Sequence, residues 1–469
     1  MCVTLRRLLE ETAGYAADYL EGVPDRPVTW TAGVDELRAS LGGPLPEGST
    51  DPHTVIRELA TAADPGLVSI PGGRYFGFVI GGSVPAATAA DWLTSAWDQN
   101  AGLYAGGPSA AVVEEVAGAW LTELLGLPPG ASFGFVTGCQ MAHVTALAAA
   151  RHGVLERVGW DVNENGLFGA PPIRVVVGAE RHTTIDRALR LLGLGTSCVV
   201  PVAADGQGRL LPAALRAELA AGGGPTIVCA QAGNVNTGAF DPLDEIADAA
   251  DAAGAWLHVD GAFGLWAAAS PALRHLVAGA ERADSWATDA HKWLNVPYDS
   301  GIAFCAHPDA HRAAMSVRAS YLIHAGPGGP RDQMDWNPEF SRRARGFAVY
   351  AAIRSLGRSG IAELVERCCA HARRFGEELG RAPGIEVLND VVLNQVLVRF
   401  LDDNGDHDAR TAAVVEAIQD DGTCWLSGTT WQGLGAMRIS VSNWSTTDDD
   451  VDRSLEAIIR AAGIVRSRG

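Results

Sequence analysis

The sequence contains a single lysine, Lys292, and every other basic residue is an arginine. Arginine can replace lysine where only charge, a salt bridge or solubility matters, but a guanidinium cannot form a Schiff base as a neutral primary amine can. Codon usage that favours arginine would explain why lysine is scarce, with one accidental survivor. Lys292 lies between His291 and Trp293, and we expect these bulky neighbours to desolvate the amine and lower its pKa. Lys292 is therefore a candidate nucleophile.

Asp260 is a second candidate, because it ends the apolar segment WLHVD. A carboxylate at the carboxyl end of a strand is well placed to contact a ligand, and it could hold a pyridinium nitrogen protonated. For an isolated Val-Asp pair, a helix cap or a salt-bridge partner is the more ordinary role.

Two further segments add a possible anion site and a possible stacking group. The stretch SFGFVTGCQMAH predicts a strand, a turn at Gly138 and a helix whose first N–H groups can hold a phosphate, although most such junctions bind nothing. His182 lies between an apolar segment and a helix, where a histidine is usually a structural donor but can also stack on a flat heteroaromatic ring. An amine, a carboxylate, a phosphate seat and a stacking imidazole together match the needs of pyridoxal phosphate.

These segments resemble the group II pyridoxal-phosphate-dependent amino acid decarboxylases, a family that includes aromatic amino acid, glutamate and histidine decarboxylases. The similar segments are TGCQMAH, RHTTIDRA, HVDGAFG, TDAHKWLN and MRISVSNW, and they follow the family's order from about residue 70 to the C-terminus. The resemblance implies an α/β enzyme of fold type I that binds pyridoxal 5'-phosphate. It also implies a homodimer whose active sites lie at the subunit interface.

The resemblance assigns roles to individual residues. Lys292 would form the Schiff base, Asp260 would pair with the ring nitrogen, and His182 would stack on the ring and assist proton transfer. Arg438 would bind the substrate α-carboxylate, and no metal site is implied. The implied cofactor-binding residues are Gly138, Cys139, Gln140, His182, Asp260, Ala262, His291 and Lys292.

Some positions depart from the family pattern. Gln140 and Met141 stand where the phosphate turn normally has Ser or Thr followed by Glu, but backbone donors can still bind a phosphate, so we expect the cofactor to be retained. Asn234 and Asn236 stand where the family usually has threonines near the cofactor.

The most consequential departure is Gln333, in DQMDWNPEFSRRAR, where the family's mobile loop carries the tyrosine that delivers a proton to Cα. Glutamine is not a useful acid. Either His182 or water protonates Cα and an amine forms, or the quinonoid lives longer and reacts with oxygen to give an aldehyde.

The resulting hypothesis is α-decarboxylation of an L-amino acid, with a weak preference for an aromatic or bulky apolar one, to CO2 and a primary amine. The alternatives are an oxygen-dependent aldehyde synthase, a carbon–carbon lyase that uses the same cofactor, and an inactive cofactor-binding homologue. Trp97 and Trp431 are candidates for the substrate pocket, although tryptophans more often lie in cores.

Seven short apolar segments must position these residues, and helical patterns fit between most of them. Such alternation predicts a mostly parallel seven-stranded sheet that helices cover on both faces, with ligands bound at the carboxyl ends of the strands. The predicted strands are 132–137, 173–177, 197–201, 226–230, 256–259, 285–288 and 301–305.

The patterns divide the chain into three regions. Residues 1–69 predict a helical arm too thin to fold alone, with helices at 4–20 and 53–63. Residues 70–340 predict the large cofactor-binding α/β domain, which ends in a glycine- and proline-rich loop at 324–336 that we expect to be mobile. Residues 341–469 predict a small α+β domain that begins with a long helix.

The composition limits location and partners. The 469 residues are 47% hydrophobic and carry a formal net charge of -19, which argues against nucleic acid and anionic membrane surfaces as partners. We expect the first residues not to act as a secretory signal, because they include acidic residues and no long apolar core, and no apolar run reaches the roughly 18 residues of a membrane span. The eight cysteines form no C-x-x-C pair, so we expect neither a zinc site nor a disulfide framework in a cytoplasmic enzyme.

Overall fold

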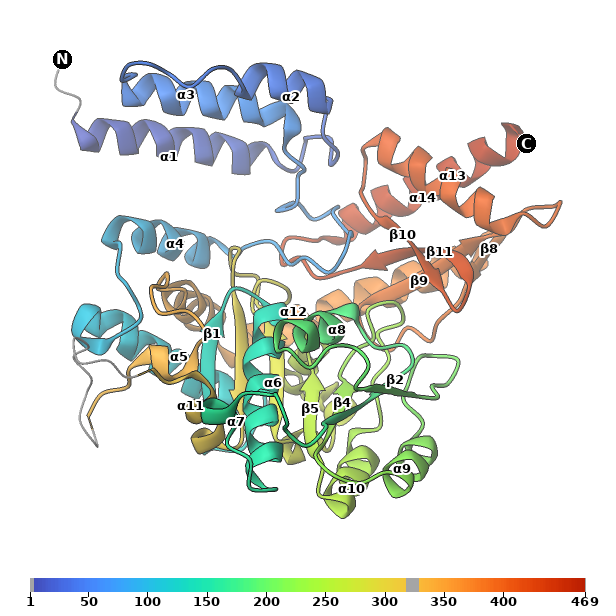
Figure 1. The fold of residues 1–469 in the computed structure, drawn as a ribbon. Helices are drawn as coiled ribbons and strands as arrows, with labels where there is room; N and C mark the ends of the chain where they lie inside the picture. The colour runs from blue at the N-terminus through green and yellow to red at the C-terminus, as the bar shows by residue number, and fades with distance from the viewer. Residues whose placement is uncertain (1–3, 318–328, 469) are drawn as a thin grey trace.

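The structure is a computed structural model that describes residues 4–317 and 329–468. Along the chain it has a helical arm, a large layered region of strands and helices, and a smaller sheet with its own helices (Figure 1). Residues 324–328 of the loop that we expected to be mobile lie outside the described residues.

The large region is built on a seven-stranded sheet in the order β1-β7-β6-β5-β4-β2-β3. The central strands pair in parallel, whereas β7 runs antiparallel to both of its neighbours, β1 and β6. The predicted fold class, a mostly parallel seven-stranded sheet of fold type I, is therefore confirmed. The strands are β1 (Ser132–Val136), β2 (Arg174–Gly178), β3 (Val199–Val202), β4 (Thr226–Gln231), β5 (Trp256–Asp260), β6 (Ser285–Asp289) and β7 (Gly301–Cys305).

Helices cover both faces of this sheet, and β4 shows how its sequence allows this. Every residue of β4 is buried; Ile227 and Cys229 pack in the same apolar cluster as residues of α6 and α8, whereas Val228 and Ala230 pack in the cluster that contains residues of α10. A strand that is apolar at both odd and even positions can be covered on two sides. The helices of this region are α4 (Pro85–Trp97), α5 (Pro108–Leu124), α6 (Cys139–Glu156), α7 (Val162–Asn165), α8 (Thr183–Leu191), α9 (Pro212–Ala221), α10 (Leu243–Ala253) and α11 (Pro308–Met315).

The junction between β1 and α6 is held by close backbone packing. Gly138 caps the start of α6, and a Cβ atom added to Gly301 would lie 2.5 Å from the Cα atom of Gly138. Only a glycine at 301 lets the first residue of β7 approach this turn so closely. The start of α6 is thereby held against the sheet.

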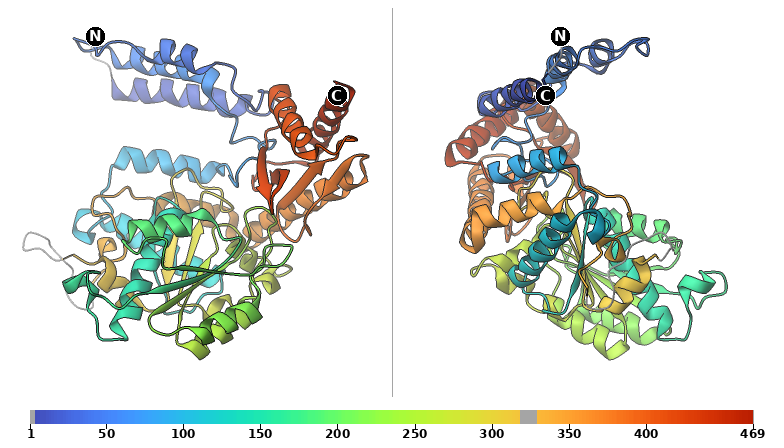
Figure 2. Two further views of the ribbon diagram at one scale, coloured as in Figure 1. Left: turned by 45° about the vertical axis from the view of Figure 1, so that its right-hand side comes forward. Right: turned by 90° about the vertical axis from the view of Figure 1, so that its left-hand side faces the viewer.

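The N-terminal arm contains α1 (Leu5–Gly22), α2 (Val34–Leu41) and α3 (Pro52–Ala63), and α2 was missing from the prediction. Asp51 caps α3 by accepting a hydrogen bond from the N–H of Thr54, and Pro52 occupies the first turn, where no donor is needed. None of the three helices has a buried residue. The arm lies apart from the sheet, beyond α4 (Figure 1; Figure 2).

The C-terminal region has a four-stranded antiparallel sheet in the order β10-β11-β9-β8. This sheet and the long helix before it agree with the small α+β region predicted for residues 341–469. The elements are α12 (Gly346–Arg381), β8 (Ile385–Val387), β9 (Gln395–Phe400), α13 (His407–Asp421), β10 (Ser427–Trp431), β11 (Leu434–Ser440) and α14 (Asp448–Arg468). Within the described residues, no helix combines the length and the apolar character needed to cross a bilayer.

Candidate active site

A cavity of about 250 Å³ lies at the carboxyl ends of the central strands. All eight residues that the sequence singled out for a cofactor line this cavity: Gly138, Cys139, Gln140, His182, Asp260, Ala262, His291 and Lys292. They come from four separate segments, which the parallel strands bring to one edge of the sheet.

Lys292 faces an unexpected carboxylate. Its Nζ lies 3.1 Å from Oδ2 of Asp289, the last residue of β6. Burial opposes the charge of the amine, but Asp289, Cys139 and Asp260 together outweigh it, so the pKa of Lys292 is raised. Our expectation of a lowered pKa was wrong, because it counted the apolar neighbours and not the carboxylate three residues earlier in the chain.

Asp260 ends β5 and is buried. Its Oδ1 accepts a hydrogen bond from the N–H of Ala262 at 3.1 Å, and its Oδ2 lies 3.5 Å from Nε2 of His143. Burial alone would raise the pKa of the Asp260 carboxyl, but His143 and His182 lower it well below its usual range. Asp260 is thus an ionised carboxylate that faces the cavity.

The start of α6 lies beside Lys292. The N–H of Cys139 donates to Oδ1 of Asp289 at 2.6 Å, so this helix end attracts an anionic group, as the sequence pattern predicts. His291 contributes from the other side: its Nδ1 accepts from the N–H of Ser300, and its ring stacks on Tyr298 at 4.3 Å. These contacts fix the ring, and its Nε2 lies 3.3 Å from the same Asp289 oxygen.

His182 caps the N-terminus of α8. Its Nδ1 lies 2.7 Å from Oγ1 of Thr184 and accepts from the N–H of the same residue. Burial lowers the pKa of His182, which favours a neutral imidazole. Because Thr184 engages Nδ1, the orientation of a ring that lines the cavity is set by the helix start.

Arg438 does not line the cavity but lies directly behind its wall. Its guanidinium donates to the carbonyl of Val235, a lining residue, at 3.2 Å and to Oδ1 of Asn236 at 3.4 Å. Asn234 lies close by, but its side chain is occupied by the carbonyl of Glu180 and by backbone N–H groups of its own turn.

Gln333 and the two tryptophans lie elsewhere. Gln333 is buried, and its amide donates to the carbonyl of Ala111 on α5 at 3.0 Å. Trp431 packs with Leu397 in the small domain, and Trp97 stands half-exposed at the end of α4. None of the three lines the cavity, so the proposed pocket role of the tryptophans finds no support within one chain.

The predicted site residues did not include Asp289, His143 or His258, although each of these carried a signal in the sequence. Asp289 precedes Lys292 by three residues at the end of a strand. His143 follows Cys139 by four residues on α6, and His258 precedes Asp260 by two on β5, so both pairs share one face of their element. Only the folded structure brings the histidines of α6 and β5 together as partners.

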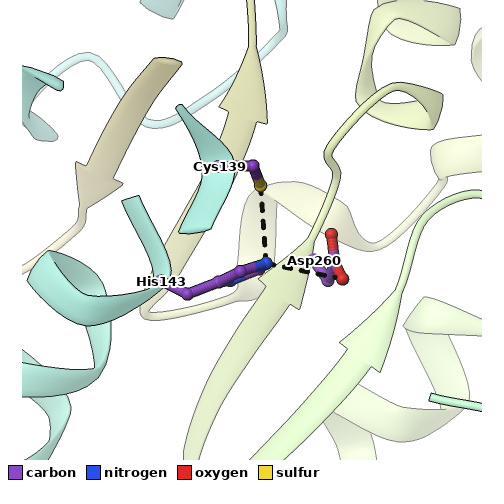
Figure 3. A group of neighbouring side chains, drawn as sticks. All are labelled: Cys139, His143 and Asp260. Carbon is purple, nitrogen blue, oxygen red and sulfur yellow. Dashed lines mark hydrogen bonds and ion pairs between the residues drawn. The ribbon is translucent and has the colours of Figure 1, made fainter. Parts of the chain in front are cut away.

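The residues present fit pyridoxal phosphate. The cavity offers one primary amine, an ionised carboxylate, a helix N-terminus and an imidazole, which are complementary to an aldehyde, a ring nitrogen, a phosphate and a ring face. Among the described residues, Cys139, His143 and Asp260 also place possible metal-ligand atoms within 4.8 Å of one another (Figure 3). A metal there would bind the same Asp260 carboxylate that would pair with the ring nitrogen, so the two ligands would compete for Asp260.

Comparisons with known proteins agree with this fit. Residues 45–401 match the pyridoxal-dependent decarboxylase conserved domain. The chain is 32% identical over 390 residues to L-2,4-diaminobutyrate decarboxylase of Rhizobium meliloti (80% of this chain, 75% of that protein). It is 28% identical over 403 residues to aromatic-L-amino-acid decarboxylase of Bacillus atrophaeus (85% and 82%). A crystal structure of Oryza sativa TDC with PLP and tryptamine superposes with a TM-score of 0.92, at 24% identity, over 99% of both chains.

Proposed function

Since the chain belongs to the pyridoxal-dependent decarboxylases and is a carboxy-lyase that uses pyridoxal phosphate, we propose that it converts an aromatic or bulky apolar L-amino acid to CO2 and a primary amine. The observation that carries this proposal is the cavity that the only lysine of the chain and an ionised, buried aspartate both line.

Bound pyridoxal phosphate supplies an aldehyde for amines and a ring that accepts the electron pair left behind by CO2. Lys292 is the residue that would tether it, and Asp289, 3.1 Å from Nζ, favours the protonated form of the free amine. Asp260 holds the ring nitrogen in its protonated form, which stabilises negative charge that develops at Cα. Among the residues that line the cavity, Gly138, Cys139, Gln140 and His291 would hold the phosphate, while Ala262 and His182 would enclose the ring.

Arg438 is our candidate for the group that binds the substrate α-carboxylate. Burial lowers its pKa to about 10, so the guanidinium stays charged at neutral pH. Its bonds in the structure go to the carbonyls of Val235 and Phe78 and to the Asn236 amide oxygen, and its Nε has no partner. A buried cation without a carboxylate among these partners favours an anionic ligand.

Phe78 supports an apolar substrate side chain. Its carbonyl accepts from Arg438, its ring lies 5.6 Å from that of Trp425, and 54% of the residue is exposed. An exposed aromatic ring next to the proposed carboxylate-binding arginine suits a large apolar substrate better than an acidic one.

Gln333 motivates a second candidate, an aldehyde synthase. That reaction would convert the amino acid, O2 and water to an aldehyde, CO2, ammonia and hydrogen peroxide. The tyrosine that delivers the Cα proton in the family is replaced here by an amide that is bound to Ala111. In the favoured reaction, His182 or a water molecule protonates Cα.

One experiment tests both candidates. The protein loaded with pyridoxal phosphate is incubated with each standard amino acid, and CO2, amine, ammonia and peroxide are quantified. We expect CO2 and amine in equal amounts from Trp, Tyr, Phe or Leu, without peroxide. Aldehyde, ammonia and peroxide in amounts equal to CO2 would establish the second candidate, whereas no CO2 from any amino acid would refute both.

We further propose a cytoplasmic homodimer with domain boundaries near residues 69 and 340. The three arm helices bury no residue within one chain, and helices of this length gain most of their stability from packing. A partner subunit would supply that packing. The seven described cysteines are all free, which is typical of a reducing compartment.

A further inference from the structure

Behind Asp260, on the side away from the cavity, a row of buried polar groups crosses three elements of the sheet region. Asp260 Oδ2 lies 3.5 Å from Nε2 of His143 on α6, and His143 Nδ1 lies 2.9 Å from Nε2 of His258 on β5. The row continues from His258 Nδ1 to Ser285 Oγ at 3.0 Å on β6. Figure 3 shows the His143 ring directed from α6 toward Asp260.

The groups at the two ends of the row determine which atom donates and which accepts in each hydrogen bond. An ionised Asp260 can only accept, so Nε2 of His143 must carry the proton that faces it. With one proton on each ring, Nδ1 of His143 accepts and Nε2 of His258 donates. His258 then accepts at Nδ1 from the Ser285 hydroxyl, whose oxygen accepts from the indole N–H of Trp256 at 2.9 Å. Every donor thus points toward the carboxylate.

Burying such a row of polar groups destabilises the fold unless each group has a hydrogen-bond partner. Both imidazoles are fully buried, and burial lowers the pKa of His258 to about 3, so this ring stays neutral. Buried polar groups without partners destabilise a fold, whereas aligned hydrogen bonds strengthen one another in a low dielectric. Apolar residues could fill the same space between α6 and β5, so packing alone does not account for two histidines.

We propose that His143, oriented by His258, is a positioning residue that keeps the Asp260 carboxylate charged and aimed at the ring nitrogen of the cofactor. This inference rests on the role of Asp260 under Proposed function. His143 touches neither cofactor nor substrate in this arrangement; it acts through Asp260. The sequence signals are the pairs Cys139–His143 on α6 and His258–Asp260 on β5.

The test compares two cofactors that differ at one atom. The dissociation constant of the protein is measured for pyridoxal phosphate and for its deaza analogue, in which a carbon replaces the ring nitrogen, in the presence of a chelator. Both molecules offer the same aldehyde and phosphate, so their ratio of affinities reports the interaction at the ring nitrogen alone.

We expect His143→Leu to weaken the binding of pyridoxal phosphate by about 10- to 100-fold, the usual effect of losing a hydrogen bond to a charged group. The affinity for the analogue should change by less than about threefold. His143→Gln, whose amide N–H can replace Nε2–H, should restore most of the difference. His258→Leu should also reduce the ratio of the two affinities. In a chain that already carries His143→Leu, adding His258→Leu should reduce this ratio no further. His152→Leu, on the same helix but away from the site, is the matched control.

The outcomes distinguish an error in the assignment of Asp260 from an error in the positioning role of His143. If Asp260→Asn leaves the ratio unchanged, the assignment of Asp260 is wrong. If Asp260→Asn removes the preference but His143→Leu and His258→Leu keep it, the positioning role is refuted while Asp260 stands. Equal weakening of both cofactors by His143→Leu would show a structural role only and would also refute it. Should His143→Leu fail to fold, His143→Gln and His258→Leu decide the question by the same ratio.

Discussion

The contact between Lys292 and Asp289 sets the charge of the proposed nucleophile. A protonated amine cannot attack an aldehyde, so the pKa of Lys292, which Asp289 raises, determines how much of it is reactive at a given pH. Asp289 also accepts the first N–H of α6, so one carboxylate joins the amine to the helix end proposed for the phosphate.

Replacing Lys292 should remove cofactor attachment. In Lys292→Arg, the charge persists but no imine can form, so we expect the visible absorbance of the bound cofactor and CO2 release to disappear. The absorbance spectrum and the CO2 assay check this. A lysine placed on the surface by Arg216→Lys in the same chain should not restore either signal, since position and not the presence of an amine is required. An unchanged spectrum in Lys292→Arg would contradict the assignment.

The pH dependence of attachment should shift when Asp289 is neutralised. Asp289 raises the pKa of Lys292, so Asp289→Asn lowers it and increases the neutral fraction of the amine at each pH below that value. We expect the pH profile of the attachment rate, measured by stopped-flow absorbance, to move toward lower pH. A shift toward higher pH, or none, would show that Asp289 does not control the amine.

Among the elements, α6 has the largest part in the site. Its first residues carry the proposed phosphate seat, and its next turn carries His143. Its position depends on the close approach of β7, whose first residue, Gly301, lies against the turn at Gly138. The antiparallel β7 therefore supports a site to which it contributes no lining side chain.

A methyl group at Gly301 should displace this turn. The Cβ atom of Gly301→Ala would lie 2.5 Å from the Cα atom of Gly138, which is backbone and cannot yield. We expect a loss of about 1–3 kcal/mol in the free energy of unfolding, together with weaker cofactor binding, as for other overpacked sites. Urea denaturation and cofactor titration measure the two effects. Gly130→Ala, where a Cβ atom meets nothing within 4 Å, should behave as the wild type, and equal behaviour of both variants would contradict the packing argument.

At the scale of the whole molecule, the chain leaves a large apolar surface uncovered. Leu5 and Leu9 on α1 are 68% and 54% exposed, and Trp92, Leu93 and Trp97 on α4 are each nearly half-exposed. A cavity of about 880 Å³ lies between α1, α4 and the start of α14. Large exposed apolar patches mark interfaces, and these side chains are our candidates for the surface that the proposed homodimer would bury.

The proposed dimer should have twice the 49.0 kDa mass of the chain in light scattering. Charges on α1, introduced by the double variant Leu5→Glu and Leu9→Glu, should shift the mass toward that of a monomer and reduce activity, since a buried charge without a partner is costly. Phe168→Glu, which alters a 99% exposed residue outside the arm, should leave the dimer intact. A monomer in the unmodified protein would refute the dimer.

The sequence by itself determined the sheet, eight of the residues that line the cavity and the family, because each depends on local signals. Apolar runs mark strands, a Gly-containing junction marks the start of α6, and a unique lysine needs no spatial context to be noticed. The tertiary structure alone decided how distant side chains pair. Asp289 and the neighbouring Cys139 and Asp260 reverse the expected pKa shift of Lys292. His143 contacts His258 across 115 positions of chain, and Arg438 lies behind the cavity wall. Electrostatic effects fall with distance in space and not along the chain, so only the fold could reveal them.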